Sequence, residues 1–127
     1  MEDFEFEADA IYADPEMADA EFFDWGARKT LVNAKAMAGA ELTFALVWVL
    51  PGQEDPLHQH PNAEMVGHVV GGECEFQVGD ALFHLTAGDT IRVPRGVPHQ
   101  ATCTGWEPLR MIVAQSSPMV ETVPVTE

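Results

Sequence analysis

The sequence predicts an all-β domain, a sandwich or barrel built from short antiparallel strands. Its apolar segments have the length of strands, and several of them alternate apolar with polar residues. Turn-forming pairs separate these segments, among them Pro51-Gly52, Gly71-Gly72 and Gly79-Asp80. Helical periodicity is weak throughout the chain. The regular spacing of short strands therefore favours an all-β fold over an alternating α/β fold.

Each predicted strand ends at a turn signal. Residues 42–50 are rich in apolar and aromatic side chains and stop at Pro51. In residues 74–78 every second residue is apolar, and the Gly79-Asp80 pair that follows predicts a hairpin. The predicted strands cover residues 42–50, 65–70, 74–78, 81–86, 90–93, 99–104 and 109–114.

Length and composition indicate a soluble protein with one main domain. The 127 residues are enough for one well-formed core, and 46% of them are hydrophobic. No apolar run approaches the roughly 20 residues that span a bilayer. The N-terminus is acidic and lacks the basic-then-apolar profile of a signal peptide. We therefore expect a cytoplasmic location.

The charge is strongly negative and unevenly distributed. The formal net charge is −15, which argues against nucleic acids and anionic membranes as partners. Residues 1–24 hold ten of the 21 acidic residues and no Lys or Arg. We predict that residues 1–24 form an acidic arm, partly ordered or in contact with a second subunit, and that residues 25–127 form the barrel domain. Alternation in residues 4–7 allows a short edge strand in this arm.

Potential metal ligands are concentrated in one short segment. His58, His60 and Glu64 offer two imidazoles and a carboxylate within seven residues. Residues two apart on a strand point to the same side, about 6.6 Å apart along it. The turn signal Pro61-Asn62 allows the next strand to return with Glu64 aimed at the same point. His99 lies on a later predicted strand.

The spacing of these residues resembles the two signature motifs of the cupin superfamily. Nine positions match, in two blocks separated by sixteen residues, and the resemblance covers roughly residues 40–115. The first block contains Gly52, His58, His60, Glu64 and Gly71, and the second contains Gly88, Pro94, Gly96 and His99. The glycines and the proline are read as turn residues, without a chemical role.

The resemblance implies an antiparallel double-stranded β-helix, the jelly-roll barrel of the cupins, with one metal ion in its mouth. Carried over residue by residue, the ligands are His58, His60, Glu64 and His99. Three imidazoles and a carboxylate with open positions suit Fe(II), Mn, Ni or Co, and also permit Zn. Small cupins are usually homodimers, so we expect a homodimer here.

Five further residues have roles that the motif leaves open or does not assign. The family's second motif usually ends in Asn four residues after the histidine, where this chain has Cys103. Cys103 is expected to point inward, as a small core residue or as a group near the metal. His68 lies four residues after Glu64, so it is expected to face into the barrel, as a core histidine or an auxiliary base. Arg92 and Arg110 lie in predicted strands, and either side chain could point into the pocket. His84 is expected to be exposed to solvent.

Two classes of function are compatible with this sequence. The first is a metal-dependent enzyme acting on a small oxygen-rich substrate, anionic or carbonyl-containing, with Glu64 and His68 as catalytic residues. The resemblance admits dioxygenases, lyases, isomerases and cyclases, and a dioxygenase is preferred. The second is a non-catalytic cupin that binds or senses a metal and a small ligand. The fold alone does not decide between them.

Overall fold

The computed structural model describes residues 7–126, and its regular secondary structure is almost entirely β-strand. A three-residue 3₁₀ turn, η1 (Ala8–Ala10), precedes them. No helix among the described residues has the length and apolar character needed to cross a bilayer. The strands are β1 (Ala20–Phe23), β2 (Gly26–Val32), β3 (Thr43–Val49), β4 (His58–Gln59), β5 (Met65–Gly71), β6 (Glu73–Val78), β7 (Ala81–Thr86), β8 (Thr90–Val93), β9 (His99–Cys103), β10 (Leu109–Gln115) and β11 (Val123–Pro124).

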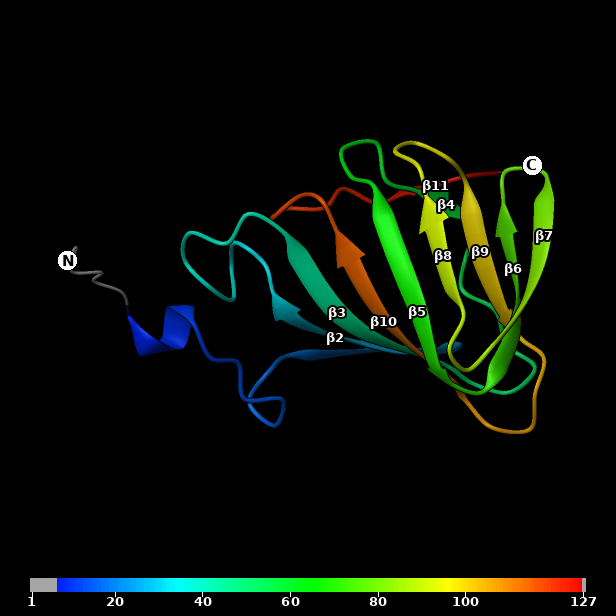
Figure 1. Ribbon diagram of the computed structural model, residues 1–127, viewed down its shortest axis with the longest axis horizontal. Helices are drawn as coiled ribbons and strands as arrows, with labels where there is room; N and C mark the ends of the chain where they lie inside the picture. Colours follow the sequence, from blue (N-terminus) through cyan, green and yellow to red (C-terminus); the bar gives the residue numbers. More distant parts are fainter. Residues whose placement is uncertain (1–6, 127) are drawn as a thin grey trace.

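The strands form two antiparallel sheets (Figure 1). One sheet has the order β1-β2-β3-β10-β5-β8, and the other has the order β11-β4-β9-β6-β7. From β3 to β5, and again from β7 to β11, the chain passes from one sheet to the other at each step. This alternation defines the jelly roll, so the all-β prediction and the predicted jelly-roll barrel are both confirmed.

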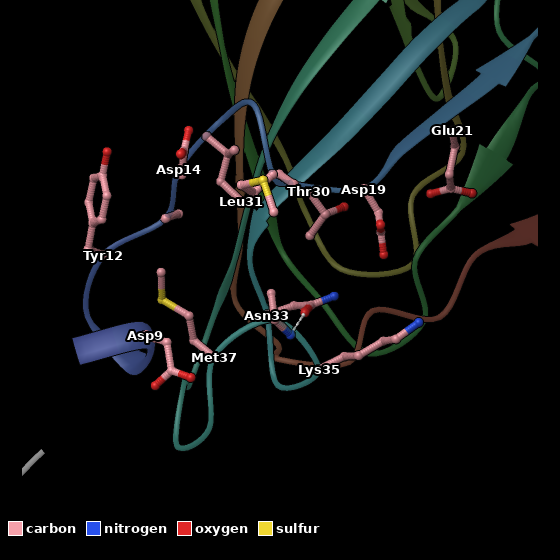
Figure 2. A pocket seen from close by; sticks show the side chains of 14 residues that line it. Asp9, Tyr12, Asp14, Asp19, Glu21, Thr30, Leu31, Asn33, Lys35 and Met37 are labelled. Atoms are coloured by element: carbon pink, nitrogen blue, oxygen red, sulfur yellow. Dashed lines mark hydrogen bonds between the residues drawn. The ribbon is translucent and has the colours of Figure 1, made fainter. Parts of the chain in front are cut away.

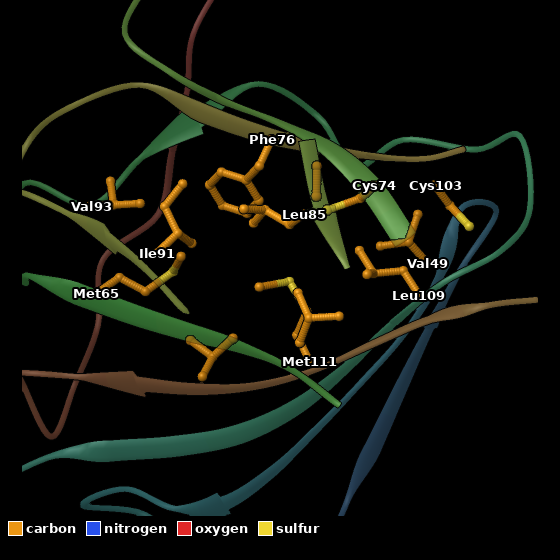
Figure 3. Packing of buried hydrophobic residues seen from close by; sticks show 13 residues of the cluster. Val49, Met65, Cys74, Phe76, Leu85, Ile91, Val93, Cys103, Leu109 and Met111 are labelled. Carbon is orange, nitrogen blue, oxygen red and sulfur yellow. The ribbon is translucent and has the colours of Figure 1, made fainter. Parts of the chain in front are cut away.

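The two sheets enclose a continuous apolar core (Figure 3). On β5 the alternation is regular: Met65 and Val69 are buried, whereas Val66 and Val70 are exposed. Leu109, at the start of β10, is completely buried. Burial of a side chain of this size contributes about 1.5–3 kcal/mol to folding. The core cluster consists of Val49, Met65, Val69, Cys74, Phe76, Leu85, Ile91, Val93, Ala101, Cys103, Leu109, Met111 and Val113.

The predicted strands agree with the observed ones within a few residues, and β4 lies where the spacing of His58 and His60 assumed a strand, but three strands were missed. These are β1, β2 and the two-residue strand β11. β1 lies inside the predicted acidic arm, and it pairs with β2 along the edge of the larger sheet. The predicted boundary at residues 24 and 25 therefore falls in the turn between two paired strands. The edge strand expected over residues 4–7 lies outside the described residues, except for Glu7.

Candidate metal centre

Three histidines from two adjacent strands converge inside the barrel. His58 on β4 pairs with His99 on β9, and His60 follows directly after β4. All three side chains are buried, and one ring nitrogen from each lies within 4.8 Å of the other two. No other group of three or more His, Cys, Asp or Glu in residues 7–126 approaches as closely. The part of the predicted site that the structure brings together is this histidine cluster.

A backbone contact ties the two segments that carry these histidines. The turn before His99 contains Gly96, whose φ of +76° lies in the region that favours glycine. The Gly96 amide donates a hydrogen bond to the carbonyl of His60, at 2.9 Å. The turn residues of the second motif thus hold the His60 loop beside β9.

The orientation of each ring is set by a backbone carbonyl. In all three histidines Nδ1 lies at hydrogen-bond distance from a carbonyl oxygen, which can only accept. Nδ1 therefore carries the proton, and Nε2 presents a lone pair. His99 Nε2 is buried without a hydrogen-bond partner. The Nδ1 contacts are His58 to Pro56 at 2.6 Å, His60 to Glu121 at 3.0 Å and His99 to Val97 at 3.0 Å.

Burial keeps His60 and His99 neutral. It lowers the pKa of His60 to about 4, and the neighbouring His58 ring and the Arg28 charge act in the same direction. The pKa of His99 is likewise lowered to about 4, mainly by burial. The hydrogen bonds to backbone carbonyls oppose these shifts without cancelling them. At neutral pH His60 and His99 are therefore unprotonated, as metal binding requires.

Glu64 does not join the histidines. Its carboxylate forms an exposed ion pair with Arg92 of the neighbouring strand β8. The cause is strand parity, because Met65 is the inward residue at the start of β5 and Glu64, one position earlier, faces outward. The expectation that Glu64 points at the metal site is not met, and Met65 lines the pocket instead.

The expected inward orientation of His68 is also wrong. On β5 the buried positions are Met65, Gly67 and Val69, so His68 lies on the outer face together with Glu64. Its Nδ1 lies 2.8 Å from the hydroxyl of Thr90 on β8. His68 shares the direction of Glu64, as expected, but that direction leads away from the barrel interior.

Cys103 points inward, but it is remote from the histidine cluster. It is 1% exposed, pairs across the sheet with Cys74, and donates its thiol hydrogen to the carbonyl of Glu107 at 3.2 Å. Both cysteines are free thiols. Burial raises the pKa of the Cys74 thiol to about 12, with a smaller contribution from Cys103. His84 is exposed, as expected, and lies near Glu73.

The histidines line a pocket of about 270 Å³ whose other walls are mainly apolar. The arginine in this pocket is Arg28 of β2, whereas Arg92 and Arg110 are exposed on the outside of the barrel. Sequence reasoning missed Arg28 because β2 was not predicted. The apolar wall includes Trp25, Val47, Val49, Phe76, Met111 and Val113.

Asp55 is a second charged residue that sequence reasoning missed. It lies in the loop before β4, lines the pocket, and accepts a hydrogen bond from the Ala101 amide at 2.8 Å. Its other carboxylate oxygen lies 3.8 Å from His58 Nδ1. Burial raises the pKa of Asp55, and the charges of His58 and Arg28 oppose this shift. The only sequence signal for a place of Asp55 in the pocket was its position three residues before His58.

A larger hollow of about 590 Å³ lies between the N-terminal arm and the loop after β2 (Figure 2). Asp9, Asp14, Asp19 and Glu21 contribute acidic side chains to it, and Lys35 contributes a cation. These groups are spread around an open wall and form no close cluster of potential ligands. The histidine pocket is therefore the better candidate for chemistry, although it is smaller.

The donor set in the histidine pocket fits a divalent metal ion. Three neutral imidazole nitrogens face one space, and one of them is buried without any partner. Imidazole suits Zn, Cu, Fe and Ni, and it also binds Mn and Co. His58, His60 and His99 are the residues that would hold the ion.

Comparison with known proteins assigns the family. The family model described as "Cupin domain" matches residues 45–115, more than half of the chain. The chain therefore belongs to the cupin family, and the predicted superfamily is confirmed. A germin-like protein of Oryza sativa subsp. japonica is 32% identical over 103 residues, which cover 75% of this chain and 46% of that protein. The chain thus spans about half the length of this curated relative.

Solved structures with the same fold include two oxalate decarboxylases. The enzyme of Lactobacillus farciminis, in complex with formate, superposes with a TM-score of 0.80 at 22% identity. This match covers 87% of the present chain and 34% of that enzyme. A structure of the Bacillus subtilis enzyme, described with Mn(II) centres, gives a TM-score of 0.74 at 24% identity and covers 81% of the present chain and 29% of that enzyme. At this identity the likeness shows the fold.

Proposed function

We propose that this protein is a metal-dependent enzyme that acts on a small organic anion with oxygen ligands. His58, His60 and His99 hold the divalent ion. The observation that carries this proposal is the orientation of the three buried imidazoles, each with Nδ1 bonded to a carbonyl. When bound, the ion supplies Lewis acidity that polarises a substrate oxygen or activates dioxygen.

The charged residues of the pocket support an anionic substrate. Arg28 lines the same pocket, and its guanidinium can bind a carboxylate or an enolate through two parallel hydrogen bonds. Asp55 is the one carboxylate among the lining residues, so it takes the acid–base role first expected of Glu64 and His68. The apolar walls and the volume of about 270 Å³ limit the substrate to a small molecule.

The reaction type proposed first is oxygenation. If His58, His60 and His99 held the ion, three protein donors would leave positions open for a substrate oxygen and for O₂. Decarboxylation is the second type, because the structural neighbours include oxalate decarboxylases. The two types differ in their co-substrate, because oxygenation consumes oxygen and decarboxylation does not.

The test begins with protein loaded anaerobically with Fe(II), Mn(II), Co(II) or Ni(II). Oxygen uptake is followed with catechols, β-diketones and flavonols, and CO₂ release is followed with oxalate and other small carboxylates. Arg28→Met should raise the KM for an anionic substrate while the protein keeps its metal. Arg92→Met, which removes an arginine from the outer face, is the matched control and should leave KM unchanged. Absence of turnover and of mass change with every metal would contradict the enzyme proposal.

A non-catalytic cupin that binds or senses a ligand remains the alternative function. It shares the histidine cluster and Arg28, so metal and anion binding do not distinguish it from the enzyme. Calorimetric binding of a small carboxylate to the metal-loaded protein, without any product after prolonged incubation, would favour this alternative.

A further inference from the structure

One side chain besides the histidines reaches the nitrogen side of the cluster. Gln115, the last residue of β10, is 6% exposed and lines the histidine pocket. Its amide nitrogen lies 3.3 Å from His60 Nε2. Gln115 is also the cross-strand partner of Met65, the inward residue beside Glu64. The side-chain amide of Gln115 therefore lies where the start of β5 meets the end of β10. The carboxylate of Glu64 was expected at this place.

Two other polar side chains of the pocket approach the imidazole rings at Nδ1, not at Nε2. The Thr122 hydroxyl is 3.3 Å from His60 Nδ1, on the side that faces the backbone. Asp55 approaches His58 at Nδ1 and is held by the Ala101 amide. Arg28 is a cation and cannot act as a metal ligand. Among the described lining residues, Gln115 is therefore the side chain that touches an Nε2 atom and carries an oxygen donor.

We propose that the Gln115 amide oxygen is the fourth protein ligand of the metal centre, so that the protein donors are all neutral. The amide nitrogen cannot donate to His60 Nε2 once that lone pair binds a metal. A half-turn of the amide exchanges its nitrogen and oxygen and directs the oxygen toward the histidine cluster. Carbonyl oxygens are ordinary ligands of hard divalent ions such as Mn²⁺.

This assignment changes the charge of the site and hence its substrate class. Three imidazoles and one carboxylate leave a divalent ion with a net charge of +1, whereas three imidazoles and one amide leave +2. Arg28 adds another positive charge in the same pocket. The site therefore selects a ligand that brings its own negative charge to the metal, such as a carboxylate or an enolate. The inference rests on the metal binding proposed above and names its fourth ligand and the required charge of its substrate.

The test uses Co²⁺ alone as the metal probe and acetate as the anion probe, with the full chain. Gln115→Leu removes the oxygen at nearly constant volume and should weaken Co²⁺ binding, on the order of tenfold. It should also change the visible absorption of the bound Co²⁺, which reports the ligand set. Gln77→Leu is the matched control, because that half-buried amide bonds the Gly79 carbonyl away from the pocket, and it should bind Co²⁺ like the parent.

Gln115→Glu gives two effects of opposite sign. A carboxylate at this position should tighten Co²⁺ binding, and it should weaken acetate binding because the net charge of the centre falls. An unchanged Co²⁺ affinity and spectrum in Gln115→Leu would overturn the proposal for Gln115 while metal binding by the histidines stands. Failure of the parent protein to bind Co²⁺ would overturn both proposals.

Discussion

Glu64 and Arg92 form an ion pair across β5 and β8 on the outer face of the barrel. Both side chains are more than one-third exposed, so the pair lies in water and not in the histidine pocket. The residue that reaches the pocket from the start of β5 is Met65. The signature glutamate of the first motif is thus present in the sequence, but it faces away from the histidine cluster.

This arrangement predicts that metal binding does not need Glu64. Glu64→Gln should retain stoichiometric Co²⁺ or Mn²⁺, whereas His99→Ala should lose it, as measured by elemental analysis after dialysis. The stability of Glu64→Gln should fall by no more than about 1 kcal/mol, the usual contribution of an exposed ion pair. If Glu64→Gln lost as much metal as His99→Ala, the prediction would be contradicted and Glu64 would have to be a metal ligand.

The sequence predicts the convergence of the three histidines, because this convergence depends on the local spacing of residues and turns. His58 and His60 are two residues apart, and the turn with Pro94 and Gly96 brings His99 beside them. The predicted strands follow the observed ones for the same reason: each has an apolar run and a turn signal at its end. Local patterns thus account for most of the barrel and for the convergence of three of the four residues predicted as ligands.

The positions of the other pocket residues could not be predicted, because they depend on which face of a strand a residue occupies and on strands with weak sequence signals. A shift of one residue exchanges the two faces of a strand, so the loop between His60 and β5 decides whether Glu64 or Met65 points inward. The spacing of the motif residues does not determine which of these two residues faces inward. Arg28 and Gln115 come from β2 and the end of β10, far from the motif in sequence. Their place in the pocket follows only from the pairing of the sheet.

The histidine cluster predicts a loss of stability in mild acid for the metal-free protein. Unfolded histidines titrate near pH 6.5, whereas the pKa values of His60 and His99 are about 4. Between these values the unfolded state binds more protons, so the free energy of unfolding falls as the pH drops. The slope is about 1.4 kcal/mol per pH unit for each histidine, and full stability is present above pH 6.5. The raised pKa of Asp55 acts in the opposite direction.

Urea unfolding of the metal-free protein at several pH values between 7.5 and 4.5 measures this loss. His99→Phe removes one of the two titrating groups and keeps an aromatic ring beside Phe76, so its stability should depend less steeply on pH. His84→Asn, at an exposed position, should keep the slope of the parent protein. A parent protein whose stability is constant over this range would contradict the assigned protonation states.

The two cysteines are predicted to be unreactive in the folded protein. Cys74 and Cys103 are almost completely buried, and burial raises the pKa of Cys74 to about 12, so its thiolate is scarce at pH 8. A thiol-specific reagent should label neither cysteine in the native protein and both in denaturant. Cys103→Ala should keep stoichiometric metal, because Cys103 lies outside the histidine cluster. Rapid labelling of the native protein would contradict this account.

The edge strand β1 predicts how two copies associate. Phe22 is 82% exposed on β1, at the free edge of the larger sheet, whereas its neighbour Phe23 stacks on Trp25. An exposed phenylalanine on an edge strand favours burial against a second subunit, and such burial contributes about 1.5–3 kcal/mol. If the protein is a symmetric homodimer through this edge, each dimer buries two Phe22 side chains, so Phe22→Ser should raise the dissociation constant of the dimer by roughly 10²- to 10⁴-fold.

Size-exclusion chromatography over a range of concentrations measures this change. Trp106→Ser is the matched control, because Trp106 is 99% exposed in the loop between β9 and β10, and it should elute like the parent. Removal of residues 1–19 keeps β1 and should preserve the dimer, whereas removal of residues 1–24 takes β1 away and should yield monomers. A dimer that survives both Phe22→Ser and the longer truncation would place the subunit contact on another face of the barrel.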